Sequence, residues 1–480
     1  MQKKFIKNLA FLLFLNLLIK PFWILGIDRG VQNVLGAEEY GFYYAVFNFS
    51  FLLNILLDFG ITNFNNKNIA QNNHLLRKHL SSIIVLKMLL GGIYLLVTFI
   101  GAFVIGYSRD QLTLLIFLAL NQFLISFILY LRSNLSGLHL FKIDSMISVL
   151  DRLIMIIVCG ILLWGNTRID FTISWYVIAQ TFAYVVTALI ALIIVFRKAK
   201  SRFLTLNWSL PFSIVIIRNS FPFAVLVLLM TFYNRIDSVM IERLLPDGAE
   251  QAGIYASAYR LLDATNMIAY LFSVLLLPIF SRMIKLRDPI EDLVRLSFSL
   301  LIVAAAMVAS ISFFFRFEIM GLLYKEHIEQ SALVFGYLMA CFVPIATTYI
   351  FGTLLTANGN LKYLNIVALS GMVINIVLNT ILIPVFEVQG AGFVSLTTQT
   401  LTAVAQVIIA TRIFHFKVNY VYLGRLFAFF AIAAACTYGA TQLPCGWIIQ
   451  VVVAAAVASS MAFVTRLLSI RGMLKILKYG

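Results

Sequence analysis

Apolar residues occur in long runs along the chain, and short polar or charged segments separate these runs from one end to the other. Each run has about 20 residues, the length that a helix needs to cross the hydrocarbon core of a bilayer. A transmembrane barrel would instead show segments of about ten residues with alternating apolar and polar positions. The pattern therefore predicts an all-α polytopic membrane protein.

Turn residues and charge clusters divide the runs into about 14 predicted transmembrane helices. Lys3, Lys4 and Lys7 precede the first run, but it lacks a small-residue cleavage site and more spans follow, so we expect an uncleaved helix and no signal peptide. The predicted spans are approximately 6–27, 40–62, 80–106, 111–132, 145–165, 171–196, 219–245, 251–280, 293–315, 331–357, 362–385, 390–412, 421–441 and 446–467.

The distribution of Lys and Arg orients these spans. With the N-terminus inside the cell, the N-terminal tail, the inner connections and the C-terminal tail hold 24 of the 36 basic residues, and the outer connections hold 6. Short cytoplasmic loops retain positive charge, so both termini are expected in the cytoplasm. We expect a multi-pass membrane protein with its basic loops on the cytoplasmic side.

Composition agrees with a membrane protein and limits the other possibilities. Hydrophobic residues make up 62% of the chain and charged residues 12%, against about 45–50% and about 25% in soluble domains. We interpret the net charge of +16 as a basic rim that faces lipid headgroups, because no aromatic platform or nucleic-acid motif accompanies it. The four cysteines have no paired or metal-ligand spacing, so we expect no disulfide framework, no metal and no cofactor.

A short motif recurs at two places that are equivalent in the predicted topology. Residues 36–43 read GAEEYGFY and residues 248–255 read GAEQAGIY. Each copy lies in the outer connection after the first helix of a six-helix set and leads into the second helix. A weaker match, GLHLFK at 137–142 and GNLK at 359–362, lies before the fifth helix of each set.

The repeat predicts two parallel six-helix lobes related by an axis along the membrane normal, and the cavity between them is the expected transport site. We expect an N-terminal lobe at 1–196 and a cytoplasmic linker at 197–211, followed by a C-terminal lobe at 212–415. The last two helices and a basic cytoplasmic tail, residues 416–480, belong to neither set.

Several segments resemble the bacterial oligosaccharide flippases (Wzx-type polysaccharide transporters) of the multidrug/oligosaccharidyl-lipid/polysaccharide (MOP) superfamily. They cover both lobes in the order found in that family. These segments are VLGAEEYGFYYAVFNFSFLLNILLDFGITNF at 34–64, YNRIDSVMI at 233–241, GIYASAY at 253–259, LPIFS at 277–281, and LLTANGNLKYLNIVALSGMVINIVLNTILIPVFEVQGAG at 355–392.

This resemblance implies a transporter of the bacterial cytoplasmic (inner) membrane whose two lobes form a V-shaped cleft. It also implies that the transporter works by alternating access and is not an enzyme. The substrate that it implies is an oligosaccharide on undecaprenyl diphosphate, moved to the outer leaflet for polysaccharide or O-antigen (lipopolysaccharide) biosynthesis. Coupling to H⁺ or Na⁺ is also implied, and the other expected partners are membrane lipids and polysaccharide polymerase or ligase machinery.

Charged residues inside the predicted spans are candidate site residues, because a charge at the bilayer centre costs about 2.5–3.5 kcal/mol unless it faces protein or water. The basic ones are Lys20, Lys87, Arg152, Arg218, Arg235 and Arg260, and the acidic ones are Asp58, Asp151, Asp237 and Asp263. Lys or Arg in a hydrated cleft would replace the hydration that a diphosphate loses.

We assign the diphosphate to Lys20, Arg152, Arg235 and Arg260, with Lys87 as a further candidate. For Lys20, which precedes Pro21, a place in the cavity is favoured over a purely structural kink, and Lys87 equally fits a side chain that snorkels to the interface. Arg260 and Asp263, three residues apart on one helix, fit a local ion pair as well as a substrate site. Arg218 fits snorkelling better than a place in the cleft.

The glycan requires amide, hydroxyl and aromatic partners, for which Asn54, Tyr255 and Asn266 are candidates. Asn375 and Asn379 are also present, but four-residue spacing suits contacts between helices. The candidate coupling carboxylates are Asp58, Asp237 and Asp263.

Two other functions compete with the flippase. A multidrug or small-molecule cation antiporter on the same fold would require acidic residues in its cavity, and basic residues outnumber acidic ones in the spans by six to four. A membrane glycan polymerase or ligase would require a large outer domain or loop. The longest outer connection, near residues 316–330, has about fifteen residues, and no nucleotide loop or catalytic triad is evident.

Overall fold

The computed structural model describes residues 15, 18–19, 21–62, 65–66, 69, 75–138, 140–165, 170–199, 210–417 and 419–468. Within these residues the secondary structure is helical throughout, as predicted. The chain forms two compact units, Met1–Glu242 (unit 1) and Arg243–Gly480 (unit 2). The linker between two lobes at 197–211 stays a prediction. Residues 200–209 lie outside the described part of the chain.

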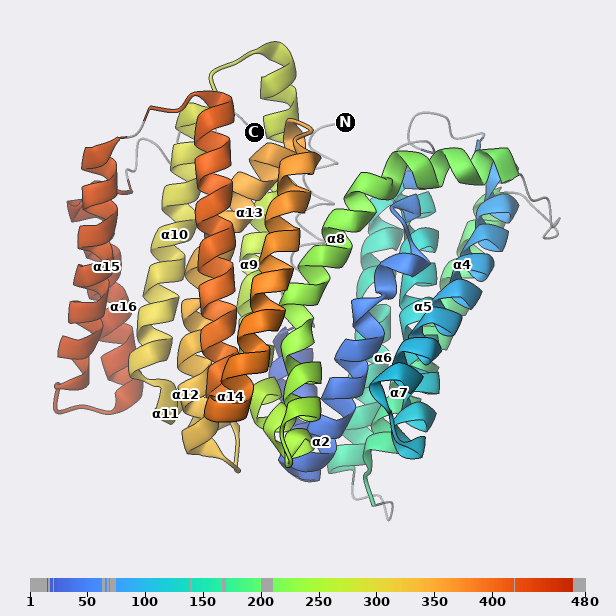
Figure 1. The fold of residues 1–480 in the computed structure, drawn as a ribbon, viewed down its shortest axis with the longest axis horizontal. Helices are drawn as coiled ribbons and strands as arrows, with labels where there is room; N and C mark the ends of the chain where they lie inside the picture. Colours follow the sequence, from blue (N-terminus) through green and yellow to red (C-terminus); the bar gives the residue numbers. More distant parts are fainter. Residues whose placement is uncertain are drawn as a thin grey trace. The chain divides into compact units, whose positions relative to one another are not determined.

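Unit 1 is a bundle of long helices around an interrupted second helix (Figure 1). The π-helix η1 leads into α2, and the 3-10 helix η2 follows α2. These elements and those after them are η1 (Trp23–Asp28), α2 (Arg29–Leu52), η2 (Asn54–Leu57), α4 (Leu75–Ile105), α5 (Arg109–Gly137), α6 (Phe141–Trp164), α7 (Ile173–Ala199) and α8 (Leu210–Leu244).

Unit 2 contains the remaining helices (Figure 1). They are α9 (Gly248–Leu286), α10 (Glu291–Phe314), α11 (Arg316–Leu323), α12 (Ile328–Ala340), α13 (Phe342–Ala357), α14 (Leu361–Phe414), α15 (Tyr420–Thr441) and α16 (Trp447–Val464). The helices α15 and α16 pack against α10 through a buried cluster that includes Ile302, Phe429 and Ala462.

The described residues hold 11 helices that are long and apolar enough to cross a membrane. One of them, α14, has 54 residues and is interrupted at Glu387, whose φ of 51° is not helical, so α14 makes two spans. Gly36 interrupts α2 in the same way with a φ of 81°. The chain is thus an all-α, multi-pass membrane protein, and the predicted fold class is confirmed.

Two predicted connections are much shorter in the structure than the sequence indicated. The segment between the first two predicted spans, 28–39, is helical except at Gly36, and 386–389 is helical except at Glu387. A single residue in the left-handed region is enough to reverse the direction of a helix. Hydropathy shows only where apolar residues give way to polar ones. Polar residues that are still helical are therefore counted as part of the connection, and its length is overestimated.

In each copy of the repeated motif, a glutamate contacts the N-terminal end of another helix in the same unit. The Glu39 carboxylate accepts a hydrogen bond of 2.8 Å from the backbone N–H of Ile173, the first residue of α7. Glu250 lies 3.3 Å from the imidazole of His327, the N-cap residue of α12. Carboxylates favour helix N-termini, where backbone N–H groups have no partner within the helix.

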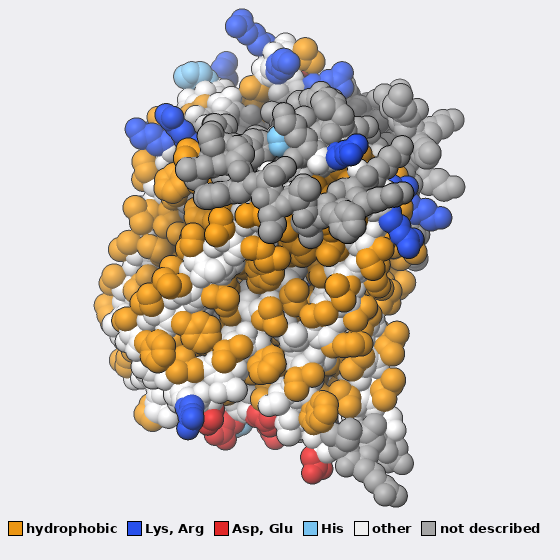
Figure 2. Space-filling model, turned by 90° about the vertical axis from the view of Figure 1, so that its right-hand side faces the viewer, with side chains coloured by type: hydrophobic (Ala, Val, Ile, Leu, Met, Phe, Trp, Pro, Cys, Tyr) orange, Lys and Arg blue, Asp and Glu red, His pale blue; other side chains and the backbone are white. Residues whose placement is uncertain are grey.

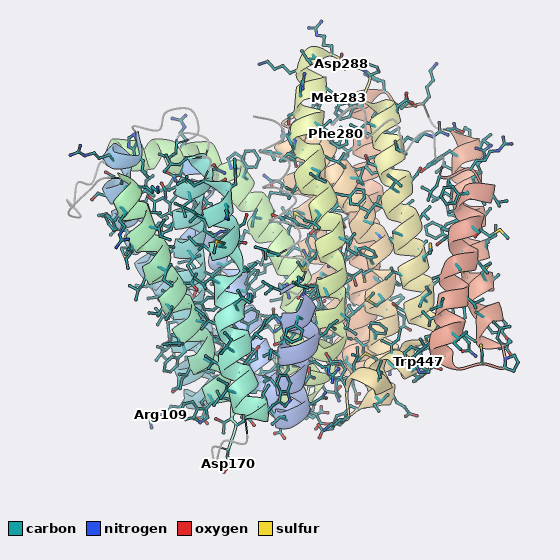
Figure 3. All side chains as sticks on the ribbon, turned by 180° about the vertical axis from the view of Figure 1, so that it is seen from behind. Arg109, Asp170, Phe280, Met283, Asp288 and Trp447 are labelled. Atoms are coloured by element: carbon teal, nitrogen blue, oxygen red, sulfur yellow. The ribbon has the colours of Figure 1, made fainter. Side chains whose placement is uncertain are left out.

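Consecutive helices of unit 1 alternate in direction, so α5 and α7, which pack against each other, run the same way. Figure 3 shows Arg109, at the start of α5, and Asp170, just before α7, at the same end of this unit. On the face seen in Figure 2, apolar side chains fill a broad middle band, Lys and Arg gather mainly above it and acidic residues lie below it. This asymmetry is the kind that the positive-inside rule describes.

The helix α9 is longer than a bilayer requires. Its 39 residues correspond to about 58 Å, against about 30 Å for a hydrocarbon core. Figure 3 shows its final part, with Phe280 and Met283, and Asp288 just beyond it at one end of unit 2. Arg282, Lys285 and Arg287 make this extension basic, as expected for a cytoplasmic segment.

The orientation can be tested with two single cysteines at opposite ends of unit 1. In a background without the four natural cysteines, we expect an impermeant maleimide to label Asp110→Cys in intact cells. Lys198→Cys should react only after the membrane is permeabilised. Both side chains are exposed. The reverse pattern would show that the termini face outward.

Gly36 should be much less tolerant of a side chain than a glycine in a regular helix. Its φ of 81° and ψ of 172° lie in a region open almost only to glycine, so Gly36→Ala should lower the free energy of unfolding by about 1–3 kcal/mol. Thermal unfolding in detergent measures this change. Gly92→Ala is the matched control, because its added Cβ meets no atom within 4 Å, and an equal loss in both variants would refute the argument.

Candidate functional site

The second helix of unit 1 is interrupted inside the membrane-spanning region. The helix α2 ends at Leu52, a short 3-10 turn follows, and the backbone turns through left-handed conformations at Phe59 (φ 42°) and Gly60 (φ 79°). In a continuous helix the N–H of Ile61 would bond the carbonyl of Leu57, but here it bonds that of Asp58 at 2.8 Å. The Leu57 carbonyl is therefore released from the helical ladder.

Lys87 of α4 supplies a hydrogen-bond donor to the Leu57 carbonyl at this interruption. Its side chain is 1% exposed, and its ammonium nitrogen donates to the Leu57 carbonyl at 2.9 Å, to Asp58 Oδ1 at 2.5 Å and to Ser126 Oγ at 2.9 Å. An ammonium has three N–H donors, so these three acceptors use all of them. Lys87 is thus an ion-paired, buried residue and does not snorkel to the interface.

Ser126 and Thr62 complete the network around this ion pair. Ser126 Oγ donates to the Leu57 carbonyl at 3.1 Å. The Asp58 carboxylate accepts from Thr62 Oγ1 at 2.6 Å and from the Thr62 backbone N–H at 3.3 Å, which caps the helical turn that resumes at residue 61. The side chain of Asp58 is 26% exposed, so one end of a buried charge pair is still accessible.

Arg152 of α6 is held in a different way, by aromatic rings. Its guanidinium carbon lies 5.5 Å from the ring centroid of Trp23 and 5.8 Å from that of Tyr184. One terminal nitrogen, Nη1, donates to the Tyr184 hydroxyl at 2.9 Å and to Met155 Sδ at 3.3 Å. Its Nε lies 3.9 Å from Asp151, beyond ordinary hydrogen-bond distance.

Arg152 lies on the inner face of α6. Met155 and Cys159, which follow it on the same face, are both fully buried, whereas Leu153 and Ile157 are 39% and 60% exposed on the lipid-facing side. Its guanidinium side chain is 26% exposed. A partly accessible guanidinium therefore lies on the inner face of α6, and among the described residues Nη2 and Nε have no acceptor closer than Asp151, which lies 3.9 Å from Nε.

A buried aromatic cluster supports this arginine. Trp23 stacks on Tyr176 with ring centroids 6.1 Å apart, and the Tyr176 hydroxyl donates to Asp28 Oδ1 at 2.5 Å. The edge of Tyr176 meets Tyr43, whose hydroxyl accepts from Gln180 at 2.9 Å. The cluster holds the Trp23 face in place against Arg152.

The sequence analysis did not identify Asp28, Tyr176 and Tyr184. The first predicted span ended at residue 27, which placed Asp28 in a loop, whereas it is 2% exposed and ends the π-helix η1. π-helical turns inside longer helices are often found at functional sites. Pro21, two residues before η1, was the available signal, because proline opens the helical hydrogen-bond ladder.

The other candidates of unit 1 do not all join these two clusters. Arg235 of α8 lies with its guanidinium 5.5 Å from the ring of Phe51, near the end of α2, and Asp237 is 1% exposed on the same helix. Asn54 is part of η2 and is half-buried. Lys20 lies outside the described residues. Arg218 is exposed near the start of α8.

The candidates of unit 2 lie on α9. Arg260, Asp263 and Asn266 are half-buried and follow one another at three-residue intervals. Asn266 Oδ1 has no hydrogen-bond partner among the described residues. Tyr255 is 1% exposed, with its hydroxyl 3.4 Å from Ser395 Oγ of α14, which places it in the packed interior of the unit.

Asn375 and Asn379 are both fully buried, and the Asn379 amide donates to the Asn375 carbonyl oxygen at 3.1 Å. The four-residue spacing therefore produces a contact within α14.

The chain resembles known proteins in sequence and in fold. The family model described as "Polysaccharide biosynthesis protein" matches residues 5–284. No curated protein shows significant sequence similarity to the chain.

Solved structures share the fold at low sequence identity. The lipid II flippase MurJ, in an inward closed conformation, has a TM-score of 0.69 and 12% identity over 96% of this chain and 98% of its own. An inward-facing multidrug resistance MATE family transporter of the MOP superfamily has a TM-score of 0.63 and 16% identity over 81% and 93%. A MOP superfamily transporter from Pyrococcus furiosus has a TM-score of 0.59 and 14% identity over 85% and 94%.

The ion pair at the interruption should show strong coupling in a double-mutant cycle. Asp58→Asn leaves a buried ammonium unpaired and should cost about 3–5 kcal/mol of stability, whereas Lys87→Met leaves the partly exposed Asp58 carboxylate unpaired and should cost less. The double variant, which buries neither charge, should lose less than the sum of the two. Thermal unfolding of the purified variants measures the coupling. Additive losses would mean that the two groups do not stabilise each other.

Proposed function

The chain belongs to the polysaccharide biosynthesis protein family, and from this premise we propose that it is a flippase for undecaprenyl-diphosphate-linked oligosaccharides. The reaction is the transfer of the lipid-linked glycan from the inner to the outer leaflet of the bacterial cytoplasmic membrane. Both termini then face the cytoplasm, and the motion is alternating access. Structures with the same fold include a lipid II flippase, which supports a lipid-linked substrate.

The observation that supports this proposal most is the environment of the Arg152 guanidinium. This group lies on the inner face of a membrane-spanning helix and has no carboxylate within hydrogen-bond distance. The aromatic rings stabilise the cation through their faces without neutralising it. A charge held in this way keeps its affinity for an anion.

The geometry of the guanidinium suits a phosphate. Within the part of the chain that the structure describes, Tyr184 and Met155 engage Nη1, which leaves Nη2 and Nε for a bidentate contact with two phosphate oxygens. The aromatic faces of Trp23 and Tyr184 fix the plane of the fork, so less side-chain entropy is lost on binding. The proposed ligand of Arg152 is therefore the diphosphate, with the lipid tail remaining in the bilayer.

The remaining assignments extend this proposal. Lys20, Arg235 and Arg260 are further phosphate ligands, and Asn54, Tyr255 and Asn266 are partners of the glycan. We leave Lys87 out of the set, because its three donors are used within the protein. For the coupling of transport to H⁺ or Na⁺, Asp237 and Asp263 stay the proposed carboxylates, and we leave Asp58 out because Lys87 is its partner within the protein.

The role of Arg152 is tested by substitution in cells that depend on this chain for surface glycan. Arg152→Gln removes the charge and Arg152→Lys removes the fork, so both should reduce glycan export. A charge-assisted hydrogen bond contributes about 1.5–3 kcal/mol, which corresponds to a loss of roughly 10- to 100-fold. Surface glycan is measured on gels and with lectins, at equal abundance of the protein in the membrane.

Arg295→Gln provides the matched control. Arg295 also packs its guanidinium on a tyrosine ring, 5.0 Å from the centroid of Tyr422, but it joins α10 to α15. Export should persist in this variant. Full export by both Arg152 variants would exclude the arginine from the substrate site.

Purified protein in liposomes separates the flippase from the antiporter. We expect translocation of an undecaprenyl-diphosphate oligosaccharide that Arg152→Gln abolishes. Extrusion of a cationic dye instead, without movement of the lipid-linked glycan, would identify a multidrug transporter.

A further inference from the structure

The interruption of the second helix has the chemistry of a cation site. A backbone carbonyl (Leu57), a carboxylate (Asp58) and a hydroxyl (Ser126) converge on one point from the interrupted helix and α5, at 2.5–2.9 Å from it. Unwound carbonyls inside a membrane commonly coordinate Na⁺ or H⁺ in transporters. Here the point is occupied by the ammonium nitrogen of Lys87.

We propose that Lys87 is a tethered cation that fills an ion-type site, and that removing its side chain opens this site to a small monovalent cation such as Na⁺. The charge is the same, and the acceptors are three oxygen atoms of kinds that coordinate hard cations. The inference concerns the stability of unit 1 and does not rest on the proposed transport function.

The three oxygen atoms are held in place without the lysine. The Leu57 carbonyl is turned away from the helical ladder by the bond between the Ile61 N–H and the Asp58 carbonyl. Both Thr62 hydrogen bonds orient the Asp58 carboxylate. Ser126 is directed by its own bond to the Leu57 carbonyl. The site is therefore built by the interrupted helix and α5, while Lys87 reaches it from α4.

The surroundings make an unoccupied site costly. Leu57 is part of a buried apolar cluster with Tyr94 and Ala119, so little water is available to the released carbonyl. A buried carboxylate without a counter-charge is strongly destabilising. A cation that enters from solution would relieve both problems, and the partly exposed side of Asp58 offers it a route.

The tether has a functional consequence. A bound Na⁺ leaves when its concentration falls, whereas an ammonium on the chain is always present. The interrupted shape of the second helix is thus independent of the ion gradient. Any coupling ion of this protein must bind elsewhere.

The test compares the full-length protein and its variants in detergent, in NaCl and in N-methyl-D-glucamine chloride of equal concentration. Lys87→Ala removes the ammonium and leaves room for an ion. Its unfolding midpoint should lie well below that of the unaltered protein in the organic salt. In NaCl it should rise with the Na⁺ concentration and then saturate, as ligand binding requires. The unaltered protein should show no difference between the salts.

Two further variants separate ion binding from packing. Lys87→Met fills the volume of the lysine stem without a charge, so its midpoint should not respond to Na⁺. Lys87→Ala combined with Asp58→Asn removes the carboxylate, so the response should disappear. A Na⁺ response of equal size in the unaltered protein or in Lys87→Met would overturn the proposal.

The absence of a Na⁺ response in Lys87→Ala would overturn it as well. If Lys87→Ala, alone and combined with Asp58→Asn, fails to fold in either salt, the proposal is also overturned, because the defect then comes from lost packing.

Discussion

In a bilayer, every interruption of a helix must be repaired by the protein itself, and the interior of unit 1 depends on how this is done. No water is available in the hydrocarbon core to replace a lost backbone hydrogen bond. The carbonyl of Leu57 is released where the second helix unwinds, and a lysine and a serine from two other helices supply its donors. An irregular backbone and a buried charge, each costly alone, are stable together because each satisfies the other.

The same unit holds a second basic residue under a different constraint. Lys87 is paired with a carboxylate at 2.5 Å and all three of its donors have oxygen acceptors, whereas Arg152 is bounded by aromatic rings and its carboxylate neighbour Asp151 lies 3.9 Å away. Residue type alone would class both as cations within the membrane. Their surroundings give Lys87 a structural role, whereas Arg152 is the residue that we propose as a ligand of the diphosphate. This difference explains why a chain with several basic residues in its spans need not use all of them for transport.

Much of the fold could be predicted from the sequence, because hydropathy and the distribution of charge are direct signals of bilayer-spanning helices. The ion pair of Lys87 and Asp58 could not, since it joins residues 29 positions apart through a turn that no local pattern indicates. The partners of Arg152 were equally hidden, because Trp23 is remote in the chain and Tyr184 belongs to the next helix. The sequence identifies which charged groups lie within the spans and therefore need partners. Only the packing of the helices shows which groups those partners are.

The repeated motif shows how one sequence pattern can serve the same purpose through different atoms. In the first copy Gly36 reverses the chain with a left-handed backbone, and Glu39 then caps α7. In the second copy Gly248 already belongs to α9, and it is Glu250, equivalent to Glu38, that contacts the start of α12. Both acidic groups anchor the beginning of another helix in their own unit, where the positive end of a helix dipole favours them. The contacting glutamate thus differs by one position between the two copies, and the interaction with a helix N-terminus is kept. The motif is better understood as a sequence that holds helices together than as a binding sequence.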